Sequence, residues 1–198
     1  DTKDRSYQII TRNPATLLRM AVDVFDPLIN KASKTFVIRG TEAHVGKSAH
    51  MEETFANDIG AVPYSEDISS WWLLRAKFGG VHFNVAHHAN MGSRPWTEKN
   101  AANYLAAILM FEAQEWNEPP PDIALRGHEH RVSDSGLNFP VQALFLPCWT
   151  FSTAHGYRSG NGGRLPKIGG LFINCSEGKY DLALEIYKMK REREWCEG

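Results

Sequence analysis

Apolar residues recur along this chain with two periods, one typical of helices and one typical of strands. After Asn13-Pro14 they follow the 3.6-residue period of an amphipathic helix, with Asn13 as the expected N-cap and Pro14 at the first helical position. Pro27 is expected to bend this helix or to divide it. A second, shorter helix is predicted to begin at an N-cap, Ser48, and to end at Gly60.

Short apolar runs and one long helical pattern occupy the rest of the chain. Trp71 to Phe78 and Val81 to Ala86 are predicted to be two strands, joined by a tight turn at Gly79-Gly80. A long helix is predicted from about Thr97 to Trp116, and a run of three prolines follows it. The other predicted strands are 35–38, 123–125, 141–146, 171–175 and 180–187.

The order of these elements predicts the fold class. Strands and helices alternate early in the chain and hairpins dominate late, which favours a layered α/β sandwich. The 198 residues are enough for one domain with a sizeable core, so we expect a single domain over 1–198. A hydrophobic content of 42% and a charged content of 23% are ordinary for a soluble globular protein.

Charge and cysteine usage narrow the class of protein further. The formal net charge of -1 excludes a global basic field that would gather nucleic acid non-specifically. The three cysteines, Cys148, Cys175 and Cys196, form no disulfide pattern, which favours a reducing compartment and a cytoplasmic location. We find no apolar run of ~18 residues and no signal peptide, so no membrane association is expected.

Histidines follow three of the predicted strands. His128 and His130 belong to a Gly-His-Glu-His segment directly after an apolar run, and in an extended chain both would point to the same side. His87 and His88 follow a second strand, and His44 follows a third at a short distance. Converging imidazoles are natural metal ligands. The pattern therefore predicts one site, assembled where the strands end.

These segments together resemble the signatures of the calcineurin-like metallophosphoesterases. The Gly-His-Glu-His segment resembles the last signature of that family, and the strand that ends in His87 resembles the one before it. The loop 40–46 resembles a variant of the family's Gly-Asn-His-Asp/Glu loop. The combination is most similar to the versions in phage and prophage proteins, and the resemblance extends over about residues 13–187.

The resemblance implies a four-layer αββα sandwich with a metal site at the strand ends. This site would hold two divalent ions of Mn, Fe or Zn. The implied metal ligands are Glu42, His87, His128 and His130. Glu42 is expected to ligate because the family's Asn position falls on Thr41 or Glu42 in this chain. His44 would be the catalytic general acid beside the leaving oxygen.

Three further residues are expected to contact the substrate. Arg39 and Arg126 each precede a glycine of a site loop, where the guanidinium could hold a phosphate or pair with a carboxylate. His88 is expected to face the substrate or to support its neighbour His87.

Two motifs of the family are missing from this sequence. The family begins with Asp-x-His and Gly-Asp-x-x-Asp motifs, which supply the first metal's ligands and a bridging carboxylate, and the chain contains neither. We therefore expect a C-terminal portion of the metallophosphoesterase domain that lacks the N-terminal strands. An upstream segment or a second chain would complete the metal site; a degenerate site is the alternative, and we favour a fragment.

The sequence thus predicts a metal-dependent phosphoesterase. The substrate would be a phosphomonoester or a phosphodiester, with a nucleic acid as one candidate, and the attacking group a metal-bound hydroxide. One alternative is a catalytically inactive scaffold or subunit that keeps the fold and binds a partner. Another is a mononuclear Zn hydrolase that uses three histidines alone.

Overall fold

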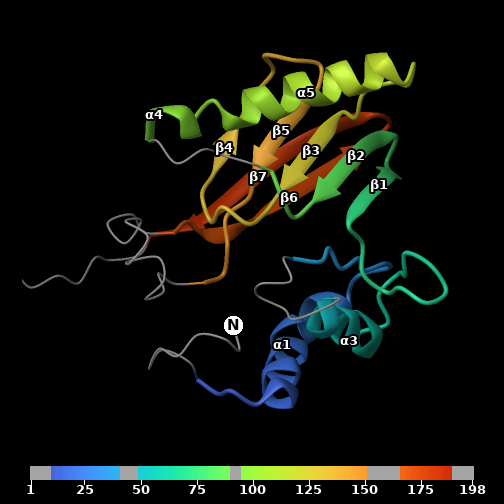
Figure 1. Cartoon of the computed structure of the whole chain (residues 1–198), viewed down its shortest axis with the longest axis vertical. Coiled ribbons are helices and arrows are strands. Elements are labelled where there is room, and N and C mark those ends of the chain that lie inside the picture. Colours follow the sequence, from blue (N-terminus) through green and yellow to red (C-terminus); the bar gives the residue numbers. More distant parts are fainter. Residues whose placement is uncertain (1–9, 41–48, 90–94, 151–165, 189–198) are drawn as a thin grey trace, which may run out of the picture.

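The computed structural model describes residues 10–40, 49–89, 95–150 and 166–188, which form two sheets and several helices (Figure 1). The helices are α1 (Pro14–Ile29), α3 (His50–Asp58), α4 (Pro95–Glu98) and α5 (Ala101–Glu115). The strands are β1 (Leu73–Phe78), β2 (Val81–Ala86), β3 (Ile123–Arg126), β4 (Ser133–Asp134), β5 (Gln142–Phe145), β6 (Ile168–Ser176) and β7 (Lys179–Tyr187).

The larger sheet has five strands in the order β1-β2-β3-β5-β4. Its three central strands, β2, β3 and β5, are parallel, and the register aligns Ala86 with Arg126 and Arg126 with Phe145. The carboxyl ends of all three therefore lie at one edge of the sheet, which is where ligands commonly bind in open α/β sheets. The outer strands β1 and β4 pair antiparallel with β2 and β5.

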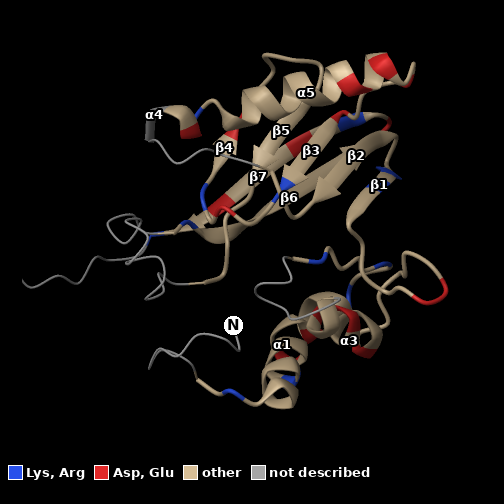
Figure 2. Cartoon of the chain, in the orientation of Figure 1, with Lys and Arg blue, Asp and Glu red and all other residues tan. Residues whose placement is uncertain are grey.

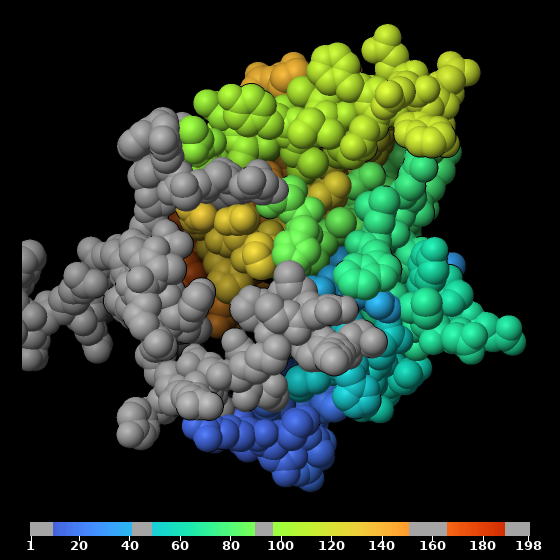
Figure 3. Space-filling view, viewed as in Figure 1, coloured from blue at the N-terminus to red at the C-terminus, as the bar shows by residue number. Residues whose placement is uncertain are grey.

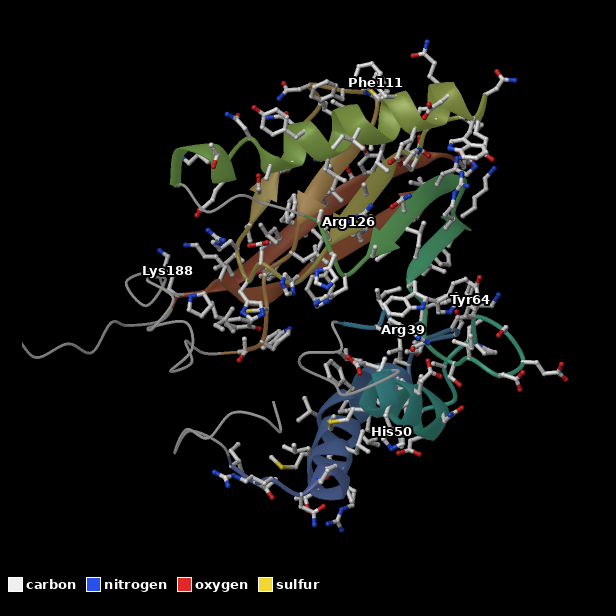
Figure 4. All side chains as sticks on the ribbon, in the orientation of Figure 1. Arg39, His50, Tyr64, Phe111, Arg126 and Lys188 are labelled. Atoms are coloured by element: carbon white, nitrogen blue, oxygen red, sulfur yellow. The ribbon has the colours of Figure 1, made fainter. Side chains whose placement is uncertain are left out.

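Helix α5 covers one face of this sheet (Figure 1). Its inward positions are Ala101, Ala102, Leu105, Ala106 and Leu109, and they form one core cluster with Ala124, Val141, Ala143 and Phe145 of the β3–β5 region. Three alanines on the helix allow its backbone to approach the sheet closely. The outward positions of the same helix, such as Tyr104 and Phe111, are exposed (Figure 4).

The two-stranded sheet β6-β7 covers the opposite face. Val81, Phe83, Ile123 and Leu144 of the larger sheet form a second core cluster, and Leu171, Ile173 and Leu182 of the smaller sheet pack against it. Two sheets that pack face to face bury the alternate residues of each strand. The described residues thus form helix, sheet and sheet in successive layers, which confirms the predicted layered α/β class.

The turns of the two hairpins hold the sheets together at one end. Gly79 and Gly80 have φ of 54° and 89°, and Gly178, with φ of 75°, donates its backbone N–H to the carbonyl of Gly79 at 2.8 Å. A Cβ added to Gly79 would lie 2.5 Å from the backbone oxygen of Cys175. Glycine is therefore required here both for the left-handed backbone and for the close approach.

The N-terminal helices pack on each other, below the two sheets in Figures 1 and 3. The Asn13 side chain accepts hydrogen bonds from the backbone N–H groups of Ala15 and Thr16, which confirms the predicted cap. The rings of Phe25 and Phe55 meet edge to face at 6.0 Å between α1 and α3. Pro27 does not divide α1, because a proline in the last turn removes few helical hydrogen bonds.

Three predicted elements differ in the structure. Residues 35–38 are not a buried strand but a half-buried extended segment, with a single parallel bridge from Ile38 to Trp71. The long helix is interrupted after Glu98, so that α4 and α5 are separate. The expected cap Ser48 lies outside the described residues, and Ala49 precedes α3 instead. None of the described helices is long and apolar enough to cross a membrane.

Candidate metal centre

Parallel strand ends bring the predicted histidines together. His87 follows β2 and Gly127 follows β3, and these strands are paired in register up to Ala86 and Arg126. The extended segment that ends at Gly40 reaches the same edge, because Cε1 and Nε2 of the His87 ring lie 3.6 Å from the point where a Cβ on Gly40 would stand. The ends of two predicted strands and the segment that ends at Gly40 therefore converge, whereas His44, the histidine predicted to follow this segment, lies outside the described residues.

Three imidazoles form a compact group at this edge. One nitrogen of each of His87, His88 and His128 lies within 4.8 Å of the others, and Nε2 of His87 is 3.1 Å from Nδ1 of His128. The centroids of the rings of His88 and His128 are 4.3 Å apart. Two nitrogens bound to one tetrahedral zinc lie about 3.3 Å apart. The spacing therefore fits two ligands of a single ion, with a third within reach.

Two glycines make room for the His87 ring. A Cβ on Gly127 would lie 3.5 Å from Nδ1 of His87, and one on Gly40 would lie 3.6 Å from Nε2. The ring is thus placed between two backbone segments that have no side chains of their own. This packing fixes the orientation of the imidazole and turns Nε2 towards His128.

The Gly-His-Glu-His segment does not continue the strand. β3 ends at Arg126, and both His128 and His130 adopt left-handed backbone with φ of 69° and 55°. The expectation that an extended chain points both rings to one side is therefore wrong. Left-handed backbone costs a non-glycine residue of order 1–3 kcal/mol and is concentrated at functional sites. His128 joins the group, whereas His130 is exposed and is not one of its three members.

An arginine anchors this loop to the preceding helix. Arg131 forms an ion pair with Glu98 of α4 and a second one with Glu129 at 2.9 Å, and all three side chains are about one-fifth exposed. Charge-assisted hydrogen bonds of this kind fix geometry as well as adding energy. The anchor explains how the loop holds two left-handed residues in place.

Arg39 takes the second of its two predicted roles, as the partner of a carboxylate. Its side chain is 7% exposed, pairs with Glu53, donates from Nε to Ser70 Oγ at 3.0 Å, and stacks on the ring of Trp72 (Figure 4). Burial raises the pKa of Glu53, but hydrogen bonds from Ser70 and Ser69 and the charge of Arg39 outweigh it and lower the pKa. The guanidinium is thus occupied within the protein.

Arg126 is also held inside the fold. Ala124 of β3 packs against α5, and Arg126 shares that face two residues later. Its Nη atoms donate to the carbonyl oxygens of Asn84 and Leu125 and to Asn84 Oδ1, at 2.7–3.0 Å. Burial lowers the pKa of Arg126 to about 10. Both Nη atoms are therefore bonded to the protein rather than directed at the strand ends.

Sequence reasoning missed one residue beside this group. Glu52, in the first turn of α3, places Oε1 3.2 Å from the backbone N–H nitrogen of Gly40. Burial raises the pKa of Glu52, although hydrogen bonds and Arg39 lower it in part. Nothing in the helical pattern distinguishes Glu52 from Glu53, so only the tertiary structure identifies it. The predicted ligand Glu42 and the predicted general acid His44 lie outside the described residues.

The residues present fit a divalent metal ion. Three imidazoles with one short nitrogen-to-nitrogen distance suit Zn, Fe or Mn. A buried carboxylate oxygen without a hydrogen-bond partner among the described residues, Glu52 Oε2, lies on the helix beside them. A buried carboxylate oxygen without a donor is a suitable ligand type for such an ion.

Comparison with known proteins adds a fold-level likeness. No protein-family model and no curated protein sequence matches the chain. A Thermotoga maritima protein solved by NMR is 16% identical with a TM-score of 0.41, over 85% of this chain and 91% of that one. A single-mutant Vps29 from Entamoeba histolytica is 13% identical with a TM-score of 0.43, over 84% of this chain and 89% of that one. An archaeal phosphodiesterase is 13% identical with a TM-score of 0.43, over 88% of this chain and 95% of that one. At this distance the likeness assigns neither a reaction nor a ligand.

Proposed function

We propose that His87, His88 and His128 form a divalent-metal centre and that this centre serves the hydrolysis of a phosphoester. The observation that supports it most directly is the convergence of three imidazole nitrogens within 4.8 Å at the ends of parallel strands. The order and spacing of the histidine segments, which resemble those of metallophosphoesterases, support the reaction class. A bound divalent ion would polarise a phosphoryl oxygen and lower the pKa of a water molecule to ~7.

The residues of the chain have separate tasks in this proposal. His87 and His128 hold the ion with Nε2 and Nδ1, since these two nitrogens face each other. His88 is the exposed member of the group, so it lies where a substrate enters. Arg39 and Arg126 stabilise the protein around the site, because their donors are bonded to Glu53, Ser70 and backbone carbonyls.

The three described histidines also favour a site with a single metal ion for the same reaction. Three histidines within reach of one ion make a zinc site with an open fourth position, which is the usual arrangement of catalytic zinc. A two-metal site would need the carboxylates of the absent Asp-x-His and Gly-Asp-x-x-Asp motifs. We propose that an upstream segment or a second chain provides them where two metals are bound.

The substrate class follows from charge only in part. Lys, Arg, Asp and Glu are interspersed over the described elements (Figure 2), and the formal net charge is -1. A long nucleic acid binds mainly through a basic surface. We therefore test small phosphoesters first, with an oligonucleotide as the comparison.

The test is metal binding followed by turnover. The 198-residue chain is loaded with Zn, Mn or Fe(II), the stoichiometry is measured by elemental analysis, and a nitrophenyl phosphodiester and monoester are assayed. We expect about one ion per chain and hydrolysis that His87→Ala and His128→Ala abolish, with His82→Ala as the control because His82 is exposed on β2. A chain that binds metal equally well without His87 and His128 would contradict the proposal. Binding without turnover would favour the inactive scaffold or the need for a further segment.

A further inference from the structure

The carboxylate of Glu52 is only half satisfied by the protein. Oε1 accepts a hydrogen bond from the backbone N–H of Gly40 at 3.2 Å. Oε2 is buried and, within the described part of the chain, has no hydrogen-bond partner. A buried polar group left unbonded costs roughly 1–3 kcal/mol, and more when it is charged. An uncompensated oxygen of this kind requires a partner that the described residues do not provide.

Its neighbour Glu53 shows what a satisfied carboxylate looks like in the same helical turn. Oε1 of Glu53 accepts hydrogen bonds from Arg39 and from both the backbone and the hydroxyl of Ser70. Oε2 accepts the backbone N–H of Ser69 at 2.7 Å. The fold therefore provides donors for one glutamate of α3 and leaves an oxygen of the other free.

Gly40 lies against both Glu52 and His87. The point where a Cβ on Gly40 would stand is 3.2 Å from Oε1 of Glu52 and 3.6 Å from both Cε1 and Nε2 of His87. The Nδ1 edge of the same ring faces Gly127 instead, at 3.5 Å from the corresponding point. Glu52 is not a member of the histidine group, whose nitrogens lie within 4.8 Å of one another, but its carboxylate and the ligating nitrogen of His87 approach the same glycine.

Charge favours the same arrangement. Neutral imidazoles bring no negative charge to a divalent ion, and the three residues of the group are all histidines. A carboxylate oxygen is a suitable fourth ligand for Zn, Fe or Mn. We propose that Glu52 provides this oxygen, so that the centre is formed by His87, His88, His128 and Glu52. The open position that the three histidines alone would leave is then a fifth one, which zinc can accept during catalysis. The inference rests on the proposed metal centre and adds the helical carboxylate to it.

The decisive variant is Glu52→Gln, which keeps the shape of the side chain and removes its charge. Asp58→Asn is the matched control, because Asp58 lies at the other end of α3 and is exposed. Zn and Co(II) affinities are measured on the 198-residue chain by competition with a chromophoric chelator, and the visible Co(II) absorption reports the ligand set. We expect Glu52→Gln to weaken binding at least 10-fold and to change the Co(II) spectrum, with Asp58→Asn unchanged.

If circular dichroism shows that Glu52→Gln does not fold properly, a second pair of variants tests the same inference. Gly40→Ala would insert a methyl group 3.2 Å from the Glu52 oxygen, whereas Gly170→Ala, on β6, would meet nothing within 4 Å. We expect Gly40→Ala to weaken Co(II) binding and alter its spectrum, and Gly170→Ala to leave both close to those of the unaltered chain.

The outcomes separate this inference from the metal centre itself. If His87→Ala abolishes metal binding while Glu52→Gln leaves affinity and spectrum unchanged, Glu52 is not a ligand and the histidine centre stands. If neither variant changes binding, the centre is wrong and the inference fails with it. Weaker binding with an altered Co(II) spectrum in Glu52→Gln, alongside loss in His87→Ala, supports both.

Discussion

At the scale of single residues, the proposed site combines one histidine on strained backbone with one that is tightly packed. His128 places Nδ1 opposite Nε2 of His87 from left-handed backbone with φ of 69°, whereas His87 lies between two glycines. The position of His128 therefore requires strained backbone, whereas packing against the two glycines holds the position of His87. This difference gives the two histidines different responses to substitution.

The strain at His128 can be measured by two substitutions that both remove the imidazole. Glycine adopts positive φ without the steric penalty that alanine has. We therefore expect His128→Gly to be more stable than His128→Ala by about 1 kcal/mol in urea unfolding, although both lose metal binding. Equal stability of the two variants would show that the left-handed backbone is not retained in solution.

The ion pair of Arg39 and Glu53 is expected to be important for stability. Glu53→Gln would leave a guanidinium that is 7% exposed without its charged partner. Removing one member of a buried pair costs about 3–5 kcal/mol. We expect a loss at the lower end of that range in urea unfolding, because Glu53 is 21% exposed. Glu66→Gln, on an exposed residue, is the control and should change stability by less than ~0.5 kcal/mol.

Cys148 gives a pH-dependent prediction. Burial raises the pKa of its thiol above the ordinary cysteine value, partly offset by hydrogen bonding to the backbone. A raised pKa means that the folded chain holds the thiol proton more tightly, so the thiolate is scarcer in the folded chain than in the unfolded chain at the same pH. We expect iodoacetamide to modify Cys148 more slowly in the folded chain than in the unfolded chain at pH 8, as peptide mass spectrometry would show.

At the scale of elements, the contact between two hairpin turns determines how the sheets stack. Gly79→Ala would place a Cβ 2.5 Å from the backbone oxygen of Cys175, at a residue with φ of 54°. Backbone cannot move aside as a flexible side chain can, so we expect a loss of more than ~2 kcal/mol. Gly60→Ala is the matched control, because Gly60 has φ of 62° but nothing within 4 Å. A similar loss in both variants would mean that the left-handed backbone alone, and not the contact, matters.

The element boundaries show how helices and loops are placed around the site. The break between α4 and α5 places Glu98 where it pairs with Arg131, and the N-terminal turn of α3 places Glu52 beside Gly40. These two helix ends therefore hold the histidine loop and the carboxylate. Their position relative to the strand ends is a property of the fold rather than of either helix alone.

At the scale of the whole molecule, the proposed metal centre would join the sheet to the N-terminal helices. His87 and His128 follow strands β2 and β3, and Glu52 belongs to α3, which lies below the sheets in Figure 1. A ligand that binds only the folded state stabilises it by about 2.7 kcal/mol at 100 times its Kd. We expect Zn to raise the melting temperature of the chain and EDTA to reverse the rise. His87→Ala is the control, and its melting temperature should be the same with and without Zn. A Zn-dependent rise in the melting temperature of that variant would contradict the assignment.

The smaller sheet is the open part of the described fold. It has two strands, and Phe172 and Tyr187 on them are 64% and 62% exposed. An isolated two-stranded ribbon is only marginally stable, and here packing against Val81, Phe83 and Leu144 supports one of its faces.

The sequence by itself determined the class of the fold and identified His87 and His128 as candidate metal ligands. Periodicity located α1, the β1-β2 hairpin and the late strands, because local patterns of burial repeat at the period of each element. The cap at Asn13 followed from local chemistry alone. Histidines at strand ends were visible because parallel strands bring their carboxyl ends to one edge, which makes their convergence a consequence of topology.

Only the tertiary structure decided which side chains face one another. It grouped His88 with His87 and His128, left the exposed His130 outside this group, and buried Arg39 and Arg126 against protein acceptors. It also distinguished Glu52 from Glu53, which are alike in sequence and in helical turn. The physical reason is that hydrogen-bond partners, desolvation and close backbone approach depend on residues distant in sequence, so no local pattern encodes them.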